Sequence, residues 1–240
     1  MIAYIPARYE SSRFPGKVLI EIGQKPLVNI VAENAAKCDY IHEVVVLTDD
    51  DRIEEAVKKV NYTKVRVVNG TSGHSGSDRV FRYIANHGVE KEPFVIIQAD
   101  CPDLDPMIMN HILAGVITNK DYSIHTIAYS FLSDDKYDDP DDPNTVKVVF
   151  NSRNGEAFYF SRSPIPFGGS KFYKHVGVYV FPHGMITRGG SVAYWTHTEN
   201  LEQLQWLMDG IKIKVHTVLN RLRTVDVPRD YTQFSALTMK

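Results

Sequence analysis

Three cationic side chains lie close together near the amino terminus. Arg8, Arg13 and Lys17 belong to the segment IPARYESSRFPGK, which follows an apolar run at residues 2–5. If this run is a strand of a parallel sheet, the segment leaves its carboxyl end, where backbone N–H groups and cations bind phosphates. GxxxxGK[ST] and GxGxxG are both absent from the sequence, which argues against a P-loop and a dinucleotide fingerprint. Although exposed basic loops are common, this position favours a triphosphate site.

Two aspartates far apart in the sequence follow other apolar residues. Asp100 ends the run VIIQAD, and Asp226 lies in RTVDVP. Carboxylates at the carboxyl edge of an open sheet are placed to bind ligands, and their oxygens are preferred by Mg²⁺, which accompanies nucleoside triphosphates. A single aspartate before a turn is commonly a cap. Two of them beside a triphosphate loop predict a site for one or two magnesium ions.

The elements that must position these residues alternate between strands and helices. Short β-branched runs bounded by turn residues recur at residues 2–5, 44–48, 65–68 and 94–98. Residues 27–38 and 79–87 carry apolar side chains at helical spacing. Because two of the runs are apolar without alternation, they suit strands buried on both faces. The pattern predicts a right-handed, doubly wound α/β fold, with helices on both faces of a mostly parallel sheet.

The pattern changes after about residue 120. An acidic loop at 134–143 precedes strand-like runs at 145–150, 157–160 and 173–181, a helix at about 198–209 and a strand at 211–218. No Gly/Ser-rich linker separates the two halves. We therefore expect a mixed-β second half that packs onto the first.

Composition narrows the class of protein. The 240 residues are 43% apolar, and 27 basic against 29 acidic residues give a net charge of −2, which argues against a nucleic-acid-binding module. No apolar run approaches the roughly 20 residues of a membrane span, and no signal peptide opens the chain, so we expect a cytoplasmic protein. Cys38 and Cys101 are the only cysteines, and we expect both to be reduced thiols.

Eight motifs, in order, resemble those of one enzyme family. They read IPARYESSRFPGK, TDDDRI, SGSDR, QADCPDLDP, YFSRSPIPF, KHVGVYVF, LEQLQWLMDGIKI and VDVPRDY. This series resembles the 3-deoxy-D-manno-octulosonate (Kdo) cytidylyltransferases, or CMP-Kdo synthetases, from residue 2 to about residue 231. The form of the opening motif distinguishes this branch from the sialic-acid cytidylyltransferases, whose equivalent loop is richer in glycine.

The resemblance implies a nucleotide-diphospho-sugar-transferase-like fold in a single domain. It implies a homodimer that uses CTP and Mg²⁺ and releases a CMP-sugar and pyrophosphate. Residues 1–120 and about 219–240 would form the nucleotide- and metal-binding part, and residues of about 121–218 the acceptor-binding and dimerisation part. Lipopolysaccharide synthesis is the pathway that such an activity serves.

The resemblance also implies individual roles. Residues expected to bind CTP are Ala7, Arg8, Arg13, Lys17, Ser75, Ser77, Arg79 and Gln98. Arg8, Arg13, Lys17 and Asp100 are expected to be catalytic, and Asp100 and Asp226 to ligate magnesium. Residues expected to bind the acceptor are Arg162, His175, Tyr179, Glu202 and Gln203. These types suit a sugar acid, which needs a cation for its carboxylate and neutral or acidic partners for its hydroxyls.

Two departures from the family pattern leave the acceptor open. Cys101 replaces a carboxylate beside the metal site, and Gln205 replaces an arginine near the expected acceptor pocket. An amino-substituted octulosonate such as 8-amino-Kdo, or a small phosphonate acid, is therefore an alternative acceptor. A catalytically idle nucleotide-sensing domain is the alternative outside the enzyme class, although the retained cations and aspartates weigh against it.

Overall fold

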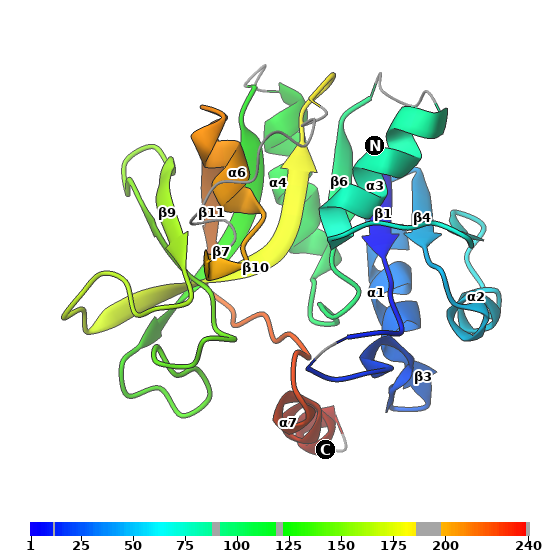
Figure 1. Ribbon diagram of the computed structural model, residues 1–240, viewed down its shortest axis with the longest axis horizontal. Helices are drawn as coiled ribbons and strands as arrows, with labels where there is room; N and C mark the ends of the chain where they lie inside the picture. Colours follow the sequence, from blue (N-terminus) through cyan, green and yellow to red (C-terminus); the bar gives the residue numbers. More distant parts are fainter. Residues whose placement is uncertain (12, 88–91, 119–121, 186–197, 239–240) are drawn as a thin grey trace.

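The computed structural model describes residues 1–11, 13–87, 92–118, 122–185 and 198–238, which form the α/β assembly of Figure 1. The strands are β1 (Ile2–Pro6), β2 (Glu21–Ile22), β3 (Lys25–Pro26), β4 (Glu43–Leu47), β5 (Val65–Val68), β6 (Phe94–Ile97), β7 (Ile124–Leu132), β8 (Lys147–Phe150), β9 (Ala157–Ser161), β10 (Lys171–Phe181) and β11 (Ile213–Val218). The helices are η1 (Lys17–Leu19), α1 (Leu27–Ala36), α2 (Asp51–Val57), α3 (Gly76–His87), α4 (Pro106–Thr118), α6 (Gln203–Met208) and α7 (Pro228–Thr238).

One large sheet has the strand order β11-β7-β10-β6-β1-β4-β5. Strands β6, β1, β4 and β5 are parallel to one another, and β11 is parallel to β7. The carboxyl ends of β1 and β4 point toward α7 and the first loop of the chain (Figure 1). Because ligands of open α/β sheets bind at this edge, the topology places Asp100, just after β6, beside the loop that follows β1.

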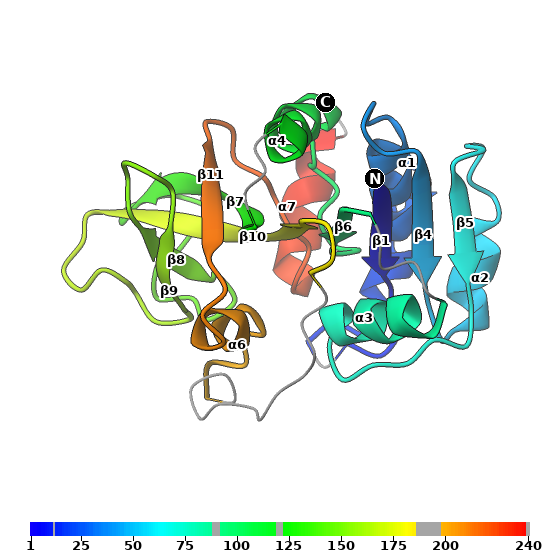
Figure 2. The ribbon, with the colours of Figure 1, turned by 90° about the horizontal axis from the view of Figure 1, so that it is seen from above.

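Helices cover both faces of the sheet, as predicted. Helices α1 and α4 lie on one side, and α3 and α6 on the other (Figure 2). Alternate residues of β1 divide between the two cores: Ala3 and Ile5 pack with α1 and α4, whereas Ile2 and Tyr4 pack with α3. Burial of both strand faces explains the continuous apolar runs at β4 and β6. Among the described residues, no helix has the length and hydropathy to cross a membrane.

The second half continues the same sheet instead of packing onto it as a separate layer. Strand β10 is antiparallel to both β6 and β7, which joins the halves edge to edge. Its register shifts between Val176 and Tyr179, and the β8–β9 hairpin branches from its first part. The sequence pattern predicted β6, β8, β9 and β10, but neither β7 nor the pairing of the strands, because periodicity identifies a strand without fixing its neighbour.

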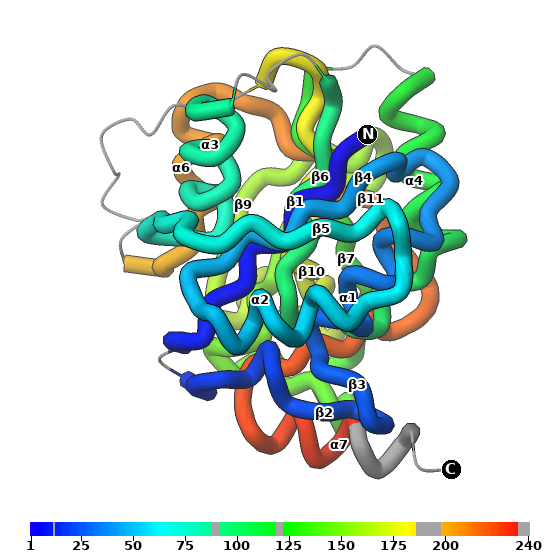
Figure 3. Tube along the Cα trace, turned by 90° about the vertical axis from the view of Figure 1, so that its right-hand side faces the viewer, coloured from blue at the N-terminus to red at the C-terminus, as the bar shows by residue number. Residues whose placement is uncertain are grey.

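Helices α6 and α7 both differ from the sequence-based expectation. The helix expected at about 198–209 is Gln203–Met208, and Asn200 has a φ of 52°, which interrupts a right-handed helix. Helix α7 was not predicted. It lies below β2 and β3 (Figure 3), where Phe234 packs with Ile22, Leu27 and Val225. This packing holds the segment that carries Asp226 against the first loop.

Candidate active site

Two cations and two carboxylates converge at the carboxyl edge of the sheet. The Lys17 Nζ donates to Asp226 Oδ1 at 3.2 Å and also to Asp100 Oδ2. Arg13 Nη2 lies 2.9 Å from the same Asp226 oxygen. A backbone hydrogen bond of 2.9 Å from the Val225 N–H to the Asp100 carbonyl aligns the two aspartate segments. The structure thus brings together four predicted site residues that are as much as 213 positions apart in sequence, since 226 − 13 = 213.

Charge pairing dominates this cluster. Burial disfavours the charged form of Lys17, but the neighbouring Asp100 and Asp226 carboxylates outweigh burial and raise the pKa of the ammonium group. Burial would likewise raise the pKa of Asp226, but Lys17 and Arg13 outweigh it and lower that pKa. Lys17 and Asp226 are therefore both charged near neutral pH.

The donor set of the cluster fits magnesium. Both carboxylates already face one ammonium group, so their oxygens are arranged around a cation. Among the described residues, no group of three or more His, Cys, Asp or Glu side chains gathers to hold a metal. Two carboxylates, with phosphate oxygens and water as further ligands, are typical of magnesium sites in phosphoryl-transfer enzymes.

A cleft of about 520 Å³ opens from this cluster toward the second half. The predicted residues that line it are Arg8, Arg13, Ser75, Gln98, Asp100, Arg162, His175, Tyr179, Glu202, Gln203 and Asp226. Arg8, Arg13 and Arg162 also line an adjoining cavity of about 710 Å³ under the first loop. Most of the predicted nucleotide and acceptor residues therefore share one space.

Three predicted nucleotide-binding residues have other contacts. The Arg79 side chain is 1% exposed and donates to Asp49 Oδ2 at 2.6 Å, so it is a buried structural cation. Ala7 is buried, and its N–H bonds to the Leu47 carbonyl at 2.9 Å. Ser77 donates to Glu202 at 2.6 Å instead of facing the cleft. These contacts lie within the protein, and the role of the three residues in CTP binding stays a prediction.

Gln98 is held between two glycines. A Cβ atom at Gly76 would lie 3.0 Å from Gln98 Oε1, and one at Gly177 would lie 2.9 Å from Gln98 Cγ. Contacts below 3.0 Å force something to move. Because Gly177 has no side chain, it leaves the space that the Gln98 side chain occupies in the cleft.

Replacing Gly177 with alanine tests the placement of Gln98. The new methyl group would displace the Gln98 side chain, and we expect the KM for CTP to rise about tenfold, as for a lost polar contact. The matched control is Gly115→Ala in α4, where a Cβ would meet nothing within 4 Å. Steady-state kinetics with varied CTP measure the effect, and equal KM values for the two variants would contradict it.

Arg162 is fixed on the acceptor side by backbone carbonyls. Its Nε donates to Glu199 O at 2.7 Å, its Nη1 to Pro143 O at 2.7 Å and its Nη2 to Asn200 O at 3.3 Å. Glu199 in turn accepts from the Arg162 N–H at 2.8 Å. Because a guanidinium group has five N–H donors, Arg162 retains two beyond these three contacts.

Three cleft or cleft-supporting residues were missed by the sequence analysis. Lys174 lines the cleft, and its Nζ lies 3.2 Å from Asp138 Oδ1. Asn144, from the acidic segment, accepts from Arg13 Nη1 at 2.9 Å. Glu199 holds Arg162, as described above. The KHVG motif included Lys174, but a surface lysine is the usual interpretation of such a residue.

His175 is buried and neutral. Its side chain contacts Thr126 Oγ1 through Nε2 at 2.9 Å, while the Thr126 hydroxyl donates to the Val178 carbonyl at 2.8 Å. The hydroxyl therefore accepts from the imidazole N–H. Burial lowers the pKa of His175 to about 3. Its imidazole thus enters the cleft lining as an uncharged hydrogen-bonding group and not as a cation.

The pKa of His175 predicts a loss of stability in mild acid. Its folded-state pKa of about 3 lies below the ordinary value of 6.5, so only the unfolded chain takes up the proton as the pH falls from 6.5 toward 3. Between pH 7 and pH 5 this uptake costs about 2 kcal/mol of unfolding free energy. Urea unfolding at both pH values should show a smaller loss for His175→Gln, and equal losses would contradict the assignment.

The two departures from the family pattern differ in position. Gln205 donates through Nε2 to Asp209 Oδ1 at 2.9 Å and is not among the described residues that line the cleft. Cys101 does line the cleft, with its Sγ 3.6 Å from Asp100 Oδ1. Of these two residues, Cys101 is the one whose side chain lines the cleft in this structure.

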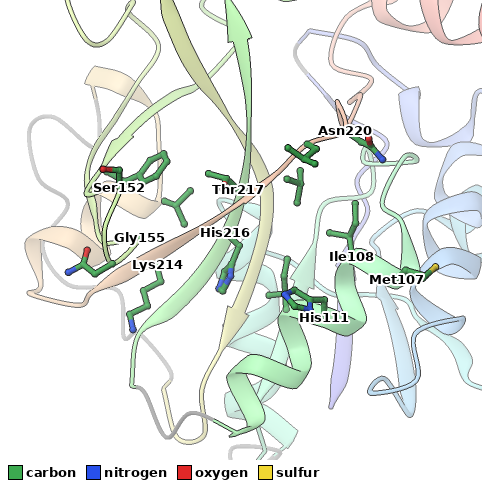
Figure 4. Close-up of a pocket in the computed structure, with 15 residues that line it drawn as sticks. Met107, Ile108, His111, Ser152, Gly155, Lys214, His216, Thr217 and Asn220 are labelled. Carbon is green, nitrogen blue, oxygen red and sulfur yellow. The ribbon is translucent and has the colours of Figure 1, made fainter.

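A third cavity, of about 710 Å³, lies at the opposite end of the sheet order from β5. It opens between α4 and β11, where His111, His216 and Lys214 line it (Figure 4). Among the residues that the structure describes, its lining shares no member with that of the cleft and includes no carboxylate. Although this cavity is larger than the cleft, its described lining lacks the carboxylates and arginines of the cleft, so we do not assign the nucleotide site to it.

Comparisons with known proteins agree with this geometry. A profile of the cytidylyltransferase family matches residues 2–213. A 3-deoxy-manno-octulosonate cytidylyltransferase of Leptospira biflexa is 33% identical over 238 residues, covering 96% of this chain and 93% of that protein. The chain belongs to the 3-deoxy-manno-octulosonate cytidylyltransferase family. It is therefore a nucleotidyltransferase, as its motifs predicted.

Two further members of this cytidylyltransferase family are similar to the chain over nearly its whole length. An 8-amino-3,8-dideoxy-manno-octulosonate cytidylyltransferase of Shewanella pealeana is 36% identical over 234 residues, with 94% of this chain and 93% of that protein covered. A solved structure of CMP:2-keto-3-deoxy-manno-octonic acid synthetase complexed with CTP superposes with a TM-score of 0.83 at 32% identity, over 99% and 98% of the two chains. The nucleotidyltransferase fold predicted from the motifs is confirmed.

Proposed function

We propose that this cytidylyltransferase transfers CMP from CTP to the anomeric hydroxyl of Kdo and releases pyrophosphate in a magnesium-dependent reaction. The observation that carries the proposal is the single cleft that joins the Lys17–Asp100–Asp226 cluster to Arg162, Glu202 and Gln203. The names of the relatives, including the solved structure with CTP, support the same substrates.

The nucleotide side of the reaction requires charge neutralisation. The α-phosphorus of CTP is shielded by negative oxygens, so the acceptor hydroxyl approaches only when cations offset that charge. Arg8, exposed at the mouth of the cleft, reaches the phosphates directly. Arg13 and Lys17 exchange their carboxylate partners for phosphate oxygens when CTP is bound. Asp100 and Asp226 would hold magnesium, which would supply further neutralisation and would lower the pKa of the attacking hydroxyl.

On the acceptor side, different residues of the cleft would bind the carboxylate and the hydroxyl groups of the sugar acid. The free N–H donors of Arg162 and the Lys174 ammonium group suit the acceptor carboxylate. The Glu202 carboxylate and the Gln203 amide suit its hydroxyls. The acceptor is thereby oriented with its anomeric centre toward the nucleotide, which is how positioning accelerates transfer.

Direct attack by the acceptor needs no covalent enzyme intermediate. The Ser161 hydroxyl donates to Glu199 Oε1 at 2.6 Å, and Ser161 is not among the described residues that line the cleft. Burial raises the pKa of the Cys101 thiol well above its ordinary value, which keeps it protonated. Neither side chain is an activated nucleophile.

Pyrophosphate release tests the proposal. The protein is incubated with magnesium and each of CTP, ATP, GTP and UTP, and with Kdo, 8-amino-Kdo, other 3-deoxy sugar acids or small phosphonates. Turnover with CTP and Kdo is the expected result. Turnover with CTP and only another acid would reassign the acceptor, and silence with every pair would contradict the enzyme assignment and favour a nucleotide-sensing role.

A second candidate acceptor is 8-amino-3,8-dideoxy-manno-octulosonate. The relative from Shewanella pealeana that is named for this acid is 36% identical, and the Glu202 carboxylate would pair with an ammonium group. Competition between the two acids in one reaction distinguishes them, because the preferred acceptor has the higher kcat/KM.

Assembly and cellular setting complete the proposal. We infer a homodimer from the family, with residues of about 121–218 as the dimerisation and acceptor-binding part and the remainder as the nucleotide-binding part. We place the reaction in the cytoplasm, as a step of lipopolysaccharide synthesis. Size-exclusion chromatography with light scattering tests the assembly, and a monomer would contradict it.

A further inference from the structure

The turn that begins α3 connects the two sides of the cleft. Ser75 Oγ donates to Glu202 Oε2 and Ser77 Oγ to Glu202 Oε1, both at 2.6 Å. Each carboxylate oxygen therefore accepts one serine hydroxyl. The partners are 127 and 125 residues apart in sequence, so the contact joins the first half of the chain to the second.

The serines themselves are held firmly. Ser77 is 1% exposed, and the Ser75 hydroxyl also accepts the Asp78 N–H at 3.1 Å. A Cβ at Gly73 would lie 2.5 Å from the Arg79 nitrogen, which shows how tightly the turn packs on α3. Gly76, between the serines, lies against the Gln98 amide. The turn thus presents fixed hydroxyl groups to Glu202 while it packs against the nucleotide side.

Two hydrogen bonds to different oxygens fix a carboxylate more strictly than one. A single donor leaves the carboxylate free to rotate about it, whereas two donors fix its plane. Each oxygen retains acceptor capacity after one bond. Because Glu202 lines the cleft, that capacity is available to the hydroxyl groups of an acceptor.

We propose that Ser75 and Ser77 are positioning residues that orient Glu202 toward the acceptor, and that they do not bind CTP. This inference rests on the proposed function, since it concerns the acceptor side of the same cleft. It assigns the SGSDR serines a role in acceptor affinity, although their segment packs beside the nucleotide-binding residue Gln98.

Steady-state kinetics of Ser77→Ala separate the two roles. We expect the KM for the acid acceptor to rise about tenfold while the KM for CTP changes by less than about twofold, because a hydrogen bond to a charged group is lost on the acceptor side alone. Ser75→Ala should show the same split, and Ser75→Thr should keep the wild-type acceptor KM. Ser152→Ala, outside the cleft, is the matched control.

A double-mutant comparison tests whether Ser77 acts on the acceptor KM through Glu202. In a Glu202→Gln background, Ser77→Ala should add little to the acceptor KM, because both changes act through one carboxylate. Full additivity, or a rise in the CTP KM with an unchanged acceptor KM, would overturn the inference. Should Ser77→Ala fail to fold, Ser75→Ala on the other carboxylate oxygen provides the same test. Wild-type inactivity with every acid would instead overturn the proposed function, and this inference with it.

Discussion

Asp100→Asn is expected to lower kcat by about a thousandfold while the protein remains folded, because the substitution removes one of two carboxylates that face the cation position. The asparagine oxygen still accepts a hydrogen bond from Lys17, and the amide is nearly the same size as the carboxylate. Lys17 also retains Asp226 as a partner at 3.2 Å. The loss should therefore appear in catalysis and not in folding.

Pyrophosphate release and thermal unfolding measure the two properties separately. Asp134→Asn is the matched control, since it makes the same change of charge at an exposed loop position. Its kcat should equal that of the wild type. Near-normal turnover in Asp100→Asn would contradict a metal-binding role for Asp100.

Lys17→Met is expected to weaken both catalysis and the folded state. The variant loses a phosphate partner, and we expect kcat/KM for CTP to fall about a hundredfold. It also leaves the Asp100 and Asp226 carboxylates facing each other without the ammonium group. With a chelator present to remove magnesium, we expect Lys17→Met to lose about 2 kcal/mol of unfolding free energy. This loss is smaller than the loss expected when one partner of a fully buried ion pair is removed, because both aspartates are partly exposed.

Magnesium should reverse much of this loss of stability. The ion binds between the same two carboxylates, so adding it should raise the melting temperature of Lys17→Met more than that of the wild type. Lys59→Met, an exposed lysine in the segment after α2, is the matched control. Equal responses to magnesium in the wild type and both variants would contradict the shared cation position.

The sequence indicated the parallel half of the fold because its signals are local. Runs such as Val44–Leu47 are apolar on every residue, which only a strand buried on both faces requires. Strand β7, Ile124–Leu132, escaped prediction although its first six residues are buried, because His125, Thr126 and Ser130 interrupt its apolar pattern. Helix α4 escaped as well. It is apolar nearly all round, so it has no distinct amphipathic stripe.

The site was predictable where strand ends determine position. Asp100 and the first loop lie together because parallel strands share an edge. The strand ends do not determine which partner each side chain contacts, so these contacts could not be predicted from the sequence. Arg79 lies on the face of α3 turned toward Asp49, and Ser77 is turned toward Glu202. Both partners are distant in sequence, and only the packed structure brings them together.

The acceptor half was the least accessible to sequence reasoning. Gln205 is two residues from Gln203, yet only Gln203 lines the cleft. The difference follows from helical geometry, because residues two apart do not face the same side. The motif therefore locates the helix, but the orientation of the helix decides which of its side chains lines the cleft.

The most direct test of the account is to follow the reaction of CTP, magnesium and Kdo by ³¹P NMR. We expect the CTP signals to be replaced by a CMP-sugar phosphodiester and pyrophosphate in equal amounts with the wild type, and to persist with Asp100→Asn. Hydrolysis of CTP without a phosphodiester product, or the same product at the same rate from both proteins, would contradict the transfer of CMP at this cleft.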